Sequence, residues 1–325
     1  MTPLETRTLE RLIVRRDHLA KLTASRNDHP WLDLMRRVDA AIGALEVGTW
    51  GLCAVCHDPM NAGRLAEDPL LTVCLECLSE ADRRSLERDL QAAGKVQRTL
   101  LPPPHLVQAG WEVAYHWEPR GVVSGDHVDL ILPSAPGAPL HLVLGDVSGK
   151  GVAAALLQSH LHALFRALVP TGQSLPDLFK RANELFAEAT SSVTYATLAA
   201  LRLAADGRFS IANAGHPRPL MVDGRGVRPL EGGGLPLGLF CDSVYAEREL
   251  MLEPGQTLLL YTDGWTEGAR GNREFGIGRA AASLRRGAGL PLPELLAACR
   301  ADLERYLAGA PRGDDLTLVA VRRAA

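Results

Sequence analysis

The sequence lacks a strong excess of charge of either sign. Its formal net charge is -3 over 325 residues, of which 22% are charged. Proteins that bind nucleic acids or membrane surfaces through electrostatics carry broad basic regions, and a chain this close to neutrality does not have the composition typical of them. We therefore expect no direct nucleic-acid binding and no membrane partner.

Long hydrophobic runs are also missing. A membrane-spanning helix needs about 20 consecutive, mainly apolar residues, and no uninterrupted apolar run approaches that length. The first residues include Glu5, Arg7 and Glu10, which is unlike a secretory signal peptide. We expect a cytoplasmic protein, in which the six cysteines are reduced or metal-bound rather than paired as disulfides.

The N-terminal third has helical periodicity with one cysteine-rich interruption. Helices are predicted over 4–47, broken by the turn sequence SRNDHP, and again over 79–100. Three consecutive prolines at 102–104 end the last helix and mark a domain boundary. We therefore predict four segments: a helical hairpin (1–49), a four-cysteine finger (50–78), a linker or switch helix (79–104) and a C-terminal domain (105–325).

The linker helix carries apolar residues at helical spacing, which predicts one buried face made by Leu86, Leu90, Ala93, Val96 and Leu100. Gly94 lies within it, and a glycine lowers helix stability by up to about 1 kcal/mol relative to alanine. Two interpretations follow. The helix is either a rigid spacer with a permanently packed face, or a switch that hinges near Gly94 and exchanges between two packings.

Beyond the prolines, strands dominate. Apolar runs and alternating stretches recur between turn sequences, with helices predicted at 152–168, 174–190 and 292–308. Grouped strands with two central helices and one late helix fit an α+β sandwich better than a βαβ repeat.

Four of the cysteines form two CxxC pairs, Cys53/Cys56 and Cys74/Cys77, separated by seventeen residues. Each pair can direct two thiolates at one tetrahedral ion, and together they complete an all-cysteine site. Redox pairs also use CxxC, but two pairs at this spacing favour zinc. Because four protein ligands leave no open position, we expect one structural Zn²⁺.

The cysteine segment LEVGTWGLCAVCHDPMNAGRLAEDPLLTVCLECL and the hairpin before it resemble the DksA/TraR zinc-finger family over about residues 5–90. That family acts in the secondary channel of RNA polymerase through acidic residues at the tip of its coiled coil. The equivalent tip here is SRNDHP, where the acidic pattern is not evident. The resemblance implies a fold, and it keeps RNA polymerase as a candidate partner: the alternative function is a polymerase-associated regulator whose C-terminal domain is a binding scaffold.

The stretch LVLGDVSGKGVAAALL places Asp146 between an apolar run and a glycine-rich turn. A Walker phosphate loop would need Ser or Thr after Lys150, and Gly151 stands there. Three other acidic turns border apolar strands, in SGDHVD, LLLYTDG and RGDDLTL; they contribute Asp126, Asp129, Asp263, Asp314 and Asp315. Convergent carboxylates repel one another unless cations neutralise them, and an oxygen-only site suits Mg²⁺ or Mn²⁺. Two such ions can activate a water for attack on a phosphate ester.

Five motifs, GDVSGKGVAAAL, NAGHPRPL, GLPLGL, LYTDGWTE and DDLTL, occur in the order found in SpoIIE/RsbU-type phosphatases, the bacterial branch of the type-2C protein phosphatases. The chain resembles this family over about residues 96–323. The resemblance implies an αββα sandwich that removes phosphate from serine or threonine, usually of an anti-sigma factor antagonist. It also implies that the helix AGKVQRTLLP couples regulation to the active site.

The resemblance also implies roles for individual residues. Asp146 would be the catalytic residue and bridge two Mn²⁺ or Mg²⁺ ions, with the carbonyl of Val147 as a further ligand. Asp263 and Asp314 would hold one ion, and Asp126 would help to hold the other. The first motif departs from the family pattern of Gly-Gly-Asp, an aromatic pair and Asp, because it reads SGDHVD. Both aspartates are kept, so metal binding is expected, with room for a different affinity. His216 in NAGHP is interpreted as a residue that orients its loop rather than as a base.

Overall fold

The computed structural model describes residues 2–23, 29–133, 135, 137–190, 194–240 and 242–324. Contacts divide the chain into two units, Met1–Arg88 and Asp89–Ala325, and each is described by itself. The division falls within helix α4 (Glu80–Leu100).

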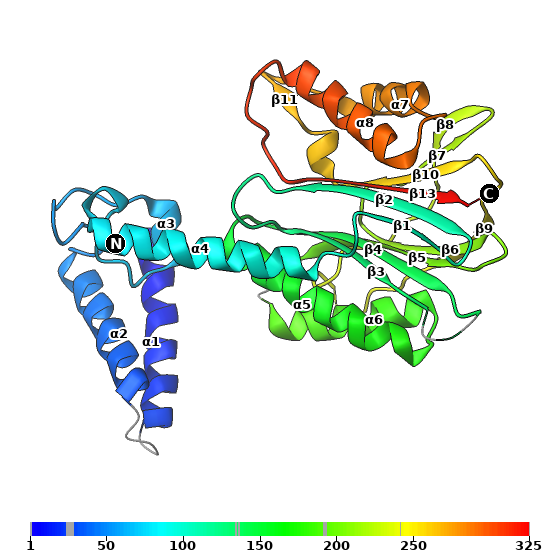
Figure 1. The fold of residues 1–325 in the computed structure, drawn as a ribbon. Helices are drawn as coiled ribbons and strands as arrows, with labels where there is room; N and C mark the ends of the chain where they lie inside the picture. Colours follow the sequence, from blue (N-terminus) through cyan, green and yellow to red (C-terminus); the bar gives the residue numbers. More distant parts are fainter. Residues whose placement is uncertain are drawn as a thin grey trace. The chain divides into compact units, whose positions relative to one another are not determined.

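The first unit contains a helical hairpin. Helices α1 (Pro3–Thr23) and α2 (His29–Val47) pack along each other (Figure 1). Their shared core consists of Leu12, Leu19, Val38, Ala41, Ile42 and Leu45, with Leu70 from the cysteine segment. The predicted hairpin is thereby confirmed, although residues 25–28 of its SRNDHP turn lie outside the described residues.

The cysteine segment follows as loops with two short helices. Helix α3 (Ala62–Glu67) begins where the Asn61 side chain accepts hydrogen bonds from the backbone N–H groups of Gly63 and Arg64. Such a cap satisfies N–H groups that have no partner within the helix. A 3₁₀ turn, η1 (Leu75–Cys77), contains the last cysteine of the cluster.

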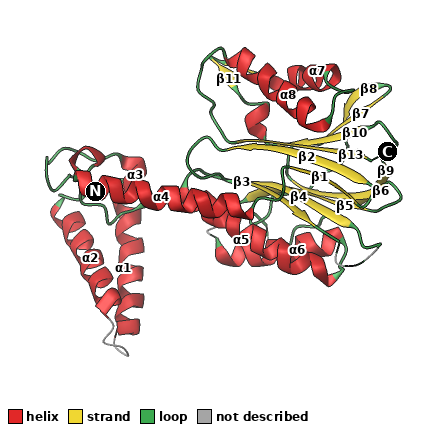
Figure 2. Cartoon of the chain, in the orientation of Figure 1, coloured by secondary structure: helices red, strands yellow, loops and turns green. Residues whose placement is uncertain are grey.

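The second unit is a sandwich of two antiparallel sheets (Figures 1 and 2). One sheet has the order β1-β2-β13-β10-β7-β8, formed by His105–Gln108, Trp111–Glu118, Leu316–Arg323, Thr257–Tyr261, Leu220–Asp223 and Gly226–Pro229. The other has the order β3-β4-β5-β6-β9, formed by Asp126–Ile131, Leu140–Val147, Ala196–Leu203, Arg208–Ala214 and Glu247–Met251. Their facing side chains form one apolar core.

Helices cover both outer faces of the sandwich. Helices α5 (Val152–Leu168) and α6 (Leu175–Ala189) pack on the β3–β9 sheet, and α7 (Gly276–Arg286) and α8 (Leu292–Leu307) pack on the other. The αββα sandwich implied by the family resemblance is confirmed. Short elements complete the fold: η2 (Val169–Thr171), η3 (Asp263–Trp265), β11 (Ala269–Arg270) and β12 (Arg273–Glu274).

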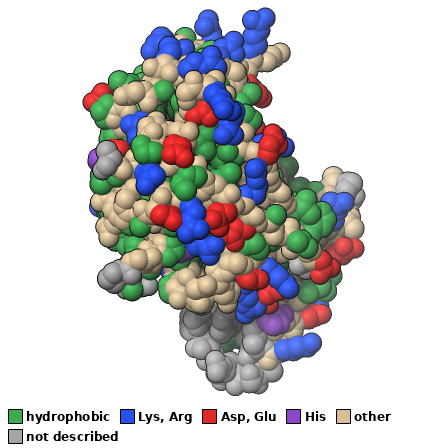
Figure 3. Space-filling view, turned by 90° about the vertical axis from the view of Figure 1, so that its right-hand side faces the viewer, with side chains coloured by type: hydrophobic (Ala, Val, Ile, Leu, Met, Phe, Trp, Pro, Cys, Tyr) green, Lys and Arg blue, Asp and Glu red, His purple; other side chains and the backbone are tan. Residues whose placement is uncertain are grey.

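Among the described residues, Val152–Thr171 is the segment long and apolar enough to cross a membrane by length and composition. In this fold the segment is a core element: Leu161 and Phe165 are fully buried against the β3–β9 sheet. The surface drawn in Figure 3 carries both basic and acidic side chains, which agrees with the small net charge of the chain.

The second half of α4 packs through a face that the sequence did not predict. Its buried residues are Gly94 and Gln97, whereas Val96 is 61% exposed. The prediction of a buried apolar stripe is therefore wrong for Ala93, which is exposed, for Val96, and for Leu86, which is 51% exposed. Gly94 allows close approach, because a Cβ at this position would lie 2.6 Å from the carbonyl oxygen of Val122.

We expect Gly94→Ala to destabilise the second unit rather than stabilise it. Helix propensity alone would make alanine more favourable by up to about 1 kcal/mol, but the added methyl group meets backbone, and overpacking of this kind typically costs about 1–3 kcal/mol. Thermal unfolding should show a lower Tm for Gly94→Ala, while Lys95→Ala on the exposed face should show little change. A higher Tm for Gly94→Ala would mean that the glycine serves flexibility rather than packing.

Candidate active site

Asp126 and Asp146 lie side by side on neighbouring strands. They are register partners at the end of the β3–β4 pair. The Asp126 carboxylate is buried, and its Oδ2 accepts hydrogen bonds from the hydroxyl groups of Thr262 (2.9 Å) and Thr317 (2.5 Å). Because these threonines belong to the opposite sheet, Asp126 is fixed from both halves of the sandwich.

Asp263 and Asp314 approach from the other sheet, just after β10 and just before β13. Gly264, next to Asp263, allows the two turns to pack closely, because a Cβ there would lie 1.9 Å from the carbonyl oxygen of Asp315. Lys150 Nζ, from the glycine-rich turn after β4, donates to Asp314 Oδ2 at 2.7 Å and to the carbonyl oxygen of Gly313 at 2.7 Å. The glycine-rich turn and the RGDDLTL turn are thus neighbours.

Asp315 has a different role from Asp314. Its two carboxylate oxygens accept hydrogen bonds from the backbone N–H groups of Arg120 (2.6 Å) and Gly125 (2.9 Å). It therefore holds in place the loop that leads into Asp126. At Gly125 a Cβ would lie 3.1 Å from the carbonyl oxygen of Val147, so the predicted carbonyl ligand lies at the same end of the sandwich.

The electrostatics of this cluster fit a cation site. Burial raises the pKa of Asp146 to about 8, with further contributions from the charges of Asp263 and Asp314. Burial, and then the neighbouring Asp146, raises the pKa of Asp126 well above its usual value. The pKa of Asp263 is raised by burial and by Asp314. Carboxylates held together against repulsion, with only oxygen donors, match the chemistry of Mg²⁺ or Mn²⁺.

The carboxylates are more widely spread than the cysteines. In the described part of the chain, no three of these aspartates have oxygens that all lie within 4.8 Å of one another. The proposed ligands of one ion, Asp146, Asp263 and Asp314, are therefore less closely gathered than the sulfur atoms of the cysteine cluster.

Asp129 does not join this cluster, because strand alternation turns it to the opposite face of β3. It is buried and forms a two-pronged ion pair with Arg166, at 2.7 and 2.6 Å. His127 shares that face, and its Nδ1 lies 3.0 Å from Gln158 Nε2. Burial lowers the pKa of His127 to about 4, so this histidine packs in neutral form.

His216 is buried behind the site. Its backbone N–H donates to Asn213 Oδ1 at 2.8 Å, and its Nδ1 lies 2.9 Å from Thr197 Oγ1. Burial lowers its pKa to about 3, and Thr197 is the register partner of Asp146. These contacts support its interpretation as a residue that orients the NAGHP loop.

Two functional candidates were not predicted from the sequence, the threonines that bind Asp126. Thr262 directly precedes Asp263, and Thr317 follows Asp315 by two positions. Their positions next to two acidic motifs could have indicated a role in the site. The sequence does not show, however, that the pairing of β10 with β13 brings the two threonines together. The backbone N–H of Thr317 donates to Thr262 Oγ1 at 3.0 Å.

The four cysteines of the first unit come together as predicted. Their sulfur atoms all lie within 4.8 Å of one another, and Cys56 Sγ is 3.8 Å from Cys74 Sγ. Backbone N–H groups of Cys56, Cys74 and Val55 lower the pKa of Cys53 to about 6, whereas burial raises the pKa of Cys74 to about 12, so the clustered thiols share their charge unequally. The cluster is compatible with one Zn²⁺ in a four-cysteine site.

The chain is similar in sequence to known proteins. The chain is 27% identical over 269 residues to Protein IcfG of Synechocystis, covering 72% of this chain and 41% of that protein. It is 28% identical over 184 residues to Phosphoserine phosphatase RsbP of Bacillus subtilis, covering 55% of this chain and 45% of that protein. The chain thus spans less than half the length of these two curated relatives.

A solved structure shares the fold. The SiaA-PP2C domain of Pseudomonas aeruginosa superposes with a TM-score of 0.64 at 24% identity, covering 74% of this chain and 98% of that chain. The model of the family described as Stage II sporulation protein E (SpoIIE) matches residues 136–324, which is more than half of the chain and includes Asp146, Asp263 and Asp314. The chain therefore belongs to the SpoIIE family.

Proposed function

We propose that the protein is a metal-dependent serine/threonine protein phosphatase. The observation that carries the proposal is the partly buried carboxylate cluster around Asp146, whose members raise one another's pKa and supply only oxygen donors. A binding scaffold has no physical need for such a cluster, which argues against the alternative of a polymerase-associated regulator. The structure and the comparisons offer no observation that favours RNA polymerase as a partner.

The residue roles proposed here are those that the family resemblance implies. Asp146 would bridge two ions, Asp263 and Asp314 would hold one of them, and Asp126 and the carbonyl oxygen of Val147 would contribute to the other. When bound, two Mg²⁺ or Mn²⁺ ions would supply positive charge for the phosphoryl oxygens and lower the pKa of the attacking water.

The surrounding residues prepare this site. The hydroxyl groups of Thr262 and Thr317 orient the Asp126 carboxylate. Asp315 fixes the loop before Asp126 through two backbone N–H groups. Lys150 Nζ lies 2.7 Å from Asp314 Oδ2 and partly offsets the charge of this carboxylate. Because both side chains are half-exposed, Asp314 stays accessible to a cation.

The substrate is proposed to be a phosphorylated protein of a partner-switching pathway, an anti-sigma factor antagonist. This rests on the relative named as a phosphoserine phosphatase and on the family resemblance. We place the protein in the cytoplasm. The four-part division at 1–49, 50–78, 79–104 and 105–325 remains a proposal, with the four-cysteine finger holding one structural Zn²⁺.

We expect the purified protein to release phosphate from a phosphoserine protein substrate in Mn²⁺ and to lose this activity in chelator. Asp314→Asn should lower the rate by about tenfold or more, equivalent to about 1.4 kcal/mol, because it removes a charge from the ion site. Asp206→Asn is a matched control, since Asp206 is exposed and binds Arg208. Hydrolysis that persists in chelator and in Asp314→Asn would exclude the proposed function.

A further inference from the structure

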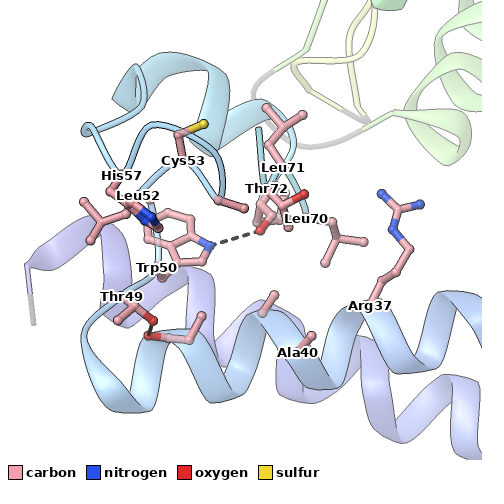
Figure 4. A pocket seen from close by; sticks show the side chains of 15 residues that line it. Arg37, Ala40, Thr49, Trp50, Leu52, Cys53, His57, Leu70, Leu71 and Thr72 are labelled. Carbon is pink, nitrogen blue, oxygen red and sulfur yellow. Dashed lines mark hydrogen bonds between the residues drawn. The ribbon is translucent and has the colours of Figure 1, made fainter. Parts of the chain in front are cut away.

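The N-terminal unit contains a cavity of about 440 Å³ between α2 and the cysteine segment (Figure 4). Three stretches form its walls: the second half of α2, residues 49–57, and residues 69–72. None of its lining residues belongs to the carboxylate cluster, so the cavity is a separate feature of the chain.

Hydrogen bonds between the walls hold the cavity open. Trp50 Nε1 donates to the carbonyl oxygen of Pro69 at 3.0 Å, drawn as a dashed line in Figure 4. The backbone N–H of Ala54 donates to the carbonyl oxygen of Thr72 at 2.7 Å, and that of Trp50 donates to Ala44 at 3.0 Å. The indole is therefore fixed as one wall instead of being free to fill the space.

The lining is mainly apolar. It is made by small residues of α2 and by larger side chains opposite them: Ala40, Ala44, Trp50, Leu52, Leu70 and Leu71. Small-molecule sites typically have volumes of about 300–1,000 Å³ and are lined by apolar side chains with a few polar groups that orient the ligand. The cavity has the size and the chemistry of such a site.

One of the lining side chains is permanently charged. Arg37 lines the cavity and makes no hydrogen bond or ion pair with any described residue, and none of the fifteen lining residues is acidic. Its guanidinium stands at one end of the cavity, beyond Leu70 (Figure 4). A planar, permanently charged guanidinium is the group best suited to bind a carboxylate with two hydrogen bonds.

His57 also lines the cavity, directly after the proposed zinc ligand Cys56, and its φ is 59°. We propose that the cavity binds an amphipathic anion, a carboxylate with an apolar chain or ring of about eight carbons, with its apolar part against Trp50 and Leu70 and its carboxylate on Arg37.

Isothermal titration of the full, zinc-loaded chain with octanoate tests the proposal. We expect saturable binding of one octanoate per chain. 1-Octanol, which has the same chain without the charge, should bind at least tenfold more weakly, and octylammonium should not bind.

Two variants and one control locate the site. Arg37→Gln should weaken octanoate binding by at least tenfold, and Ala40→Trp, at an exposed helix position on the cavity wall, should abolish it. Arg36→Gln removes the same charge from the neighbouring position, which does not line the cavity, and should leave binding unchanged. Zinc content and circular dichroism verify folding. No saturable binding, equal loss in Arg36→Gln, or undiminished binding in Ala40→Trp would overturn the proposal.

Discussion

Asp146→Asn should lower kcat/KM for the phosphoprotein substrate by about a hundredfold or more, a loss of about 2.7 kcal/mol of transition-state stabilisation. The substitution keeps the shape of the side chain and removes the charge on which the proposed pair of ions depends. Steady-state phosphate release in saturating Mn²⁺ measures the effect. Near wild-type hydrolysis by a folded Asp146→Asn variant would contradict the assignment of Asp146 as the bridging ligand.

The same substitution should stabilise the metal-free protein at high pH. The pKa of Asp146 is raised from an ordinary value of 3.8 to about 8, mainly by burial. A folded-state pKa above that of the unfolded chain adds stability that is fully present below about pH 4 and is lost as the pH rises from there through about 8. In chelator the wild-type Tm should therefore fall between pH 5 and pH 9.

Asp146→Asn should remove much of this loss. Its Tm in chelator at pH 9 should exceed that of the wild type by about 2–4 °C for each kcal/mol of repulsion relieved, with little difference at pH 5. Mn²⁺ should raise the Tm of the wild type at pH 9 more than that of the variant. If the Tm of the variant equalled that of the wild type at both pH values, the charge of Asp146 would not destabilise the metal-free fold.

Cys74→Ser should abolish zinc binding and unfold the cysteine segment. A structural zinc typically contributes about 10–16 kcal/mol of apparent binding free energy that is coupled to folding. Hydrogen exchange should show loss of protection in Met1–Arg88, while Asp89–Ala325 stays protected, because the two units have separate cores.

Cys299→Ser is the control for this experiment. Cys299 is buried in the core between α8 and the six-stranded sheet, so the variant should retain one zinc per chain. Wild-type protein purified without chelators that contains no zinc would refute the structural zinc site.

Much of the fold was predictable because its local signals are strong. Helix α5 begins at Val152. The residue before it, Gly151, has a φ of 78°, which is not a helical conformation, so the helix cannot extend further towards the N-terminus. Ser174 caps α6 by accepting a hydrogen bond from the backbone N–H of Asp177. Helix α7 was missed, because Gly276 and Gly278 lower its helix propensity, and its packing on the six-stranded sheet is not visible in the sequence.

The sequence predicted which acidic turns form the site, but it did not predict the contacts that each aspartate makes there. The pattern RGDDLTL does not distinguish Asp314, which faces Lys150, from Asp315, which binds two backbone N–H groups. That difference depends on which loops pack against the turn. The apolar stripe of α4 was misleading for a related reason: close contact at Gly94, rather than the larger apolar residues, determines which face is buried.

Anomalous diffraction from crystals grown with Mn²⁺ tests the central claim most directly. We predict manganese peaks in contact with the Asp146 carboxylate, at about the 2.0–2.2 Å typical of a small divalent ion and an oxygen ligand, with Asp263 and Asp314 as further ligands of one ion. The described chain offers a competing site, since the ligand atoms of His127, Asp129 and His162 lie within 4.8 Å of one another. Manganese bound there, with none at Asp146, would contradict the account.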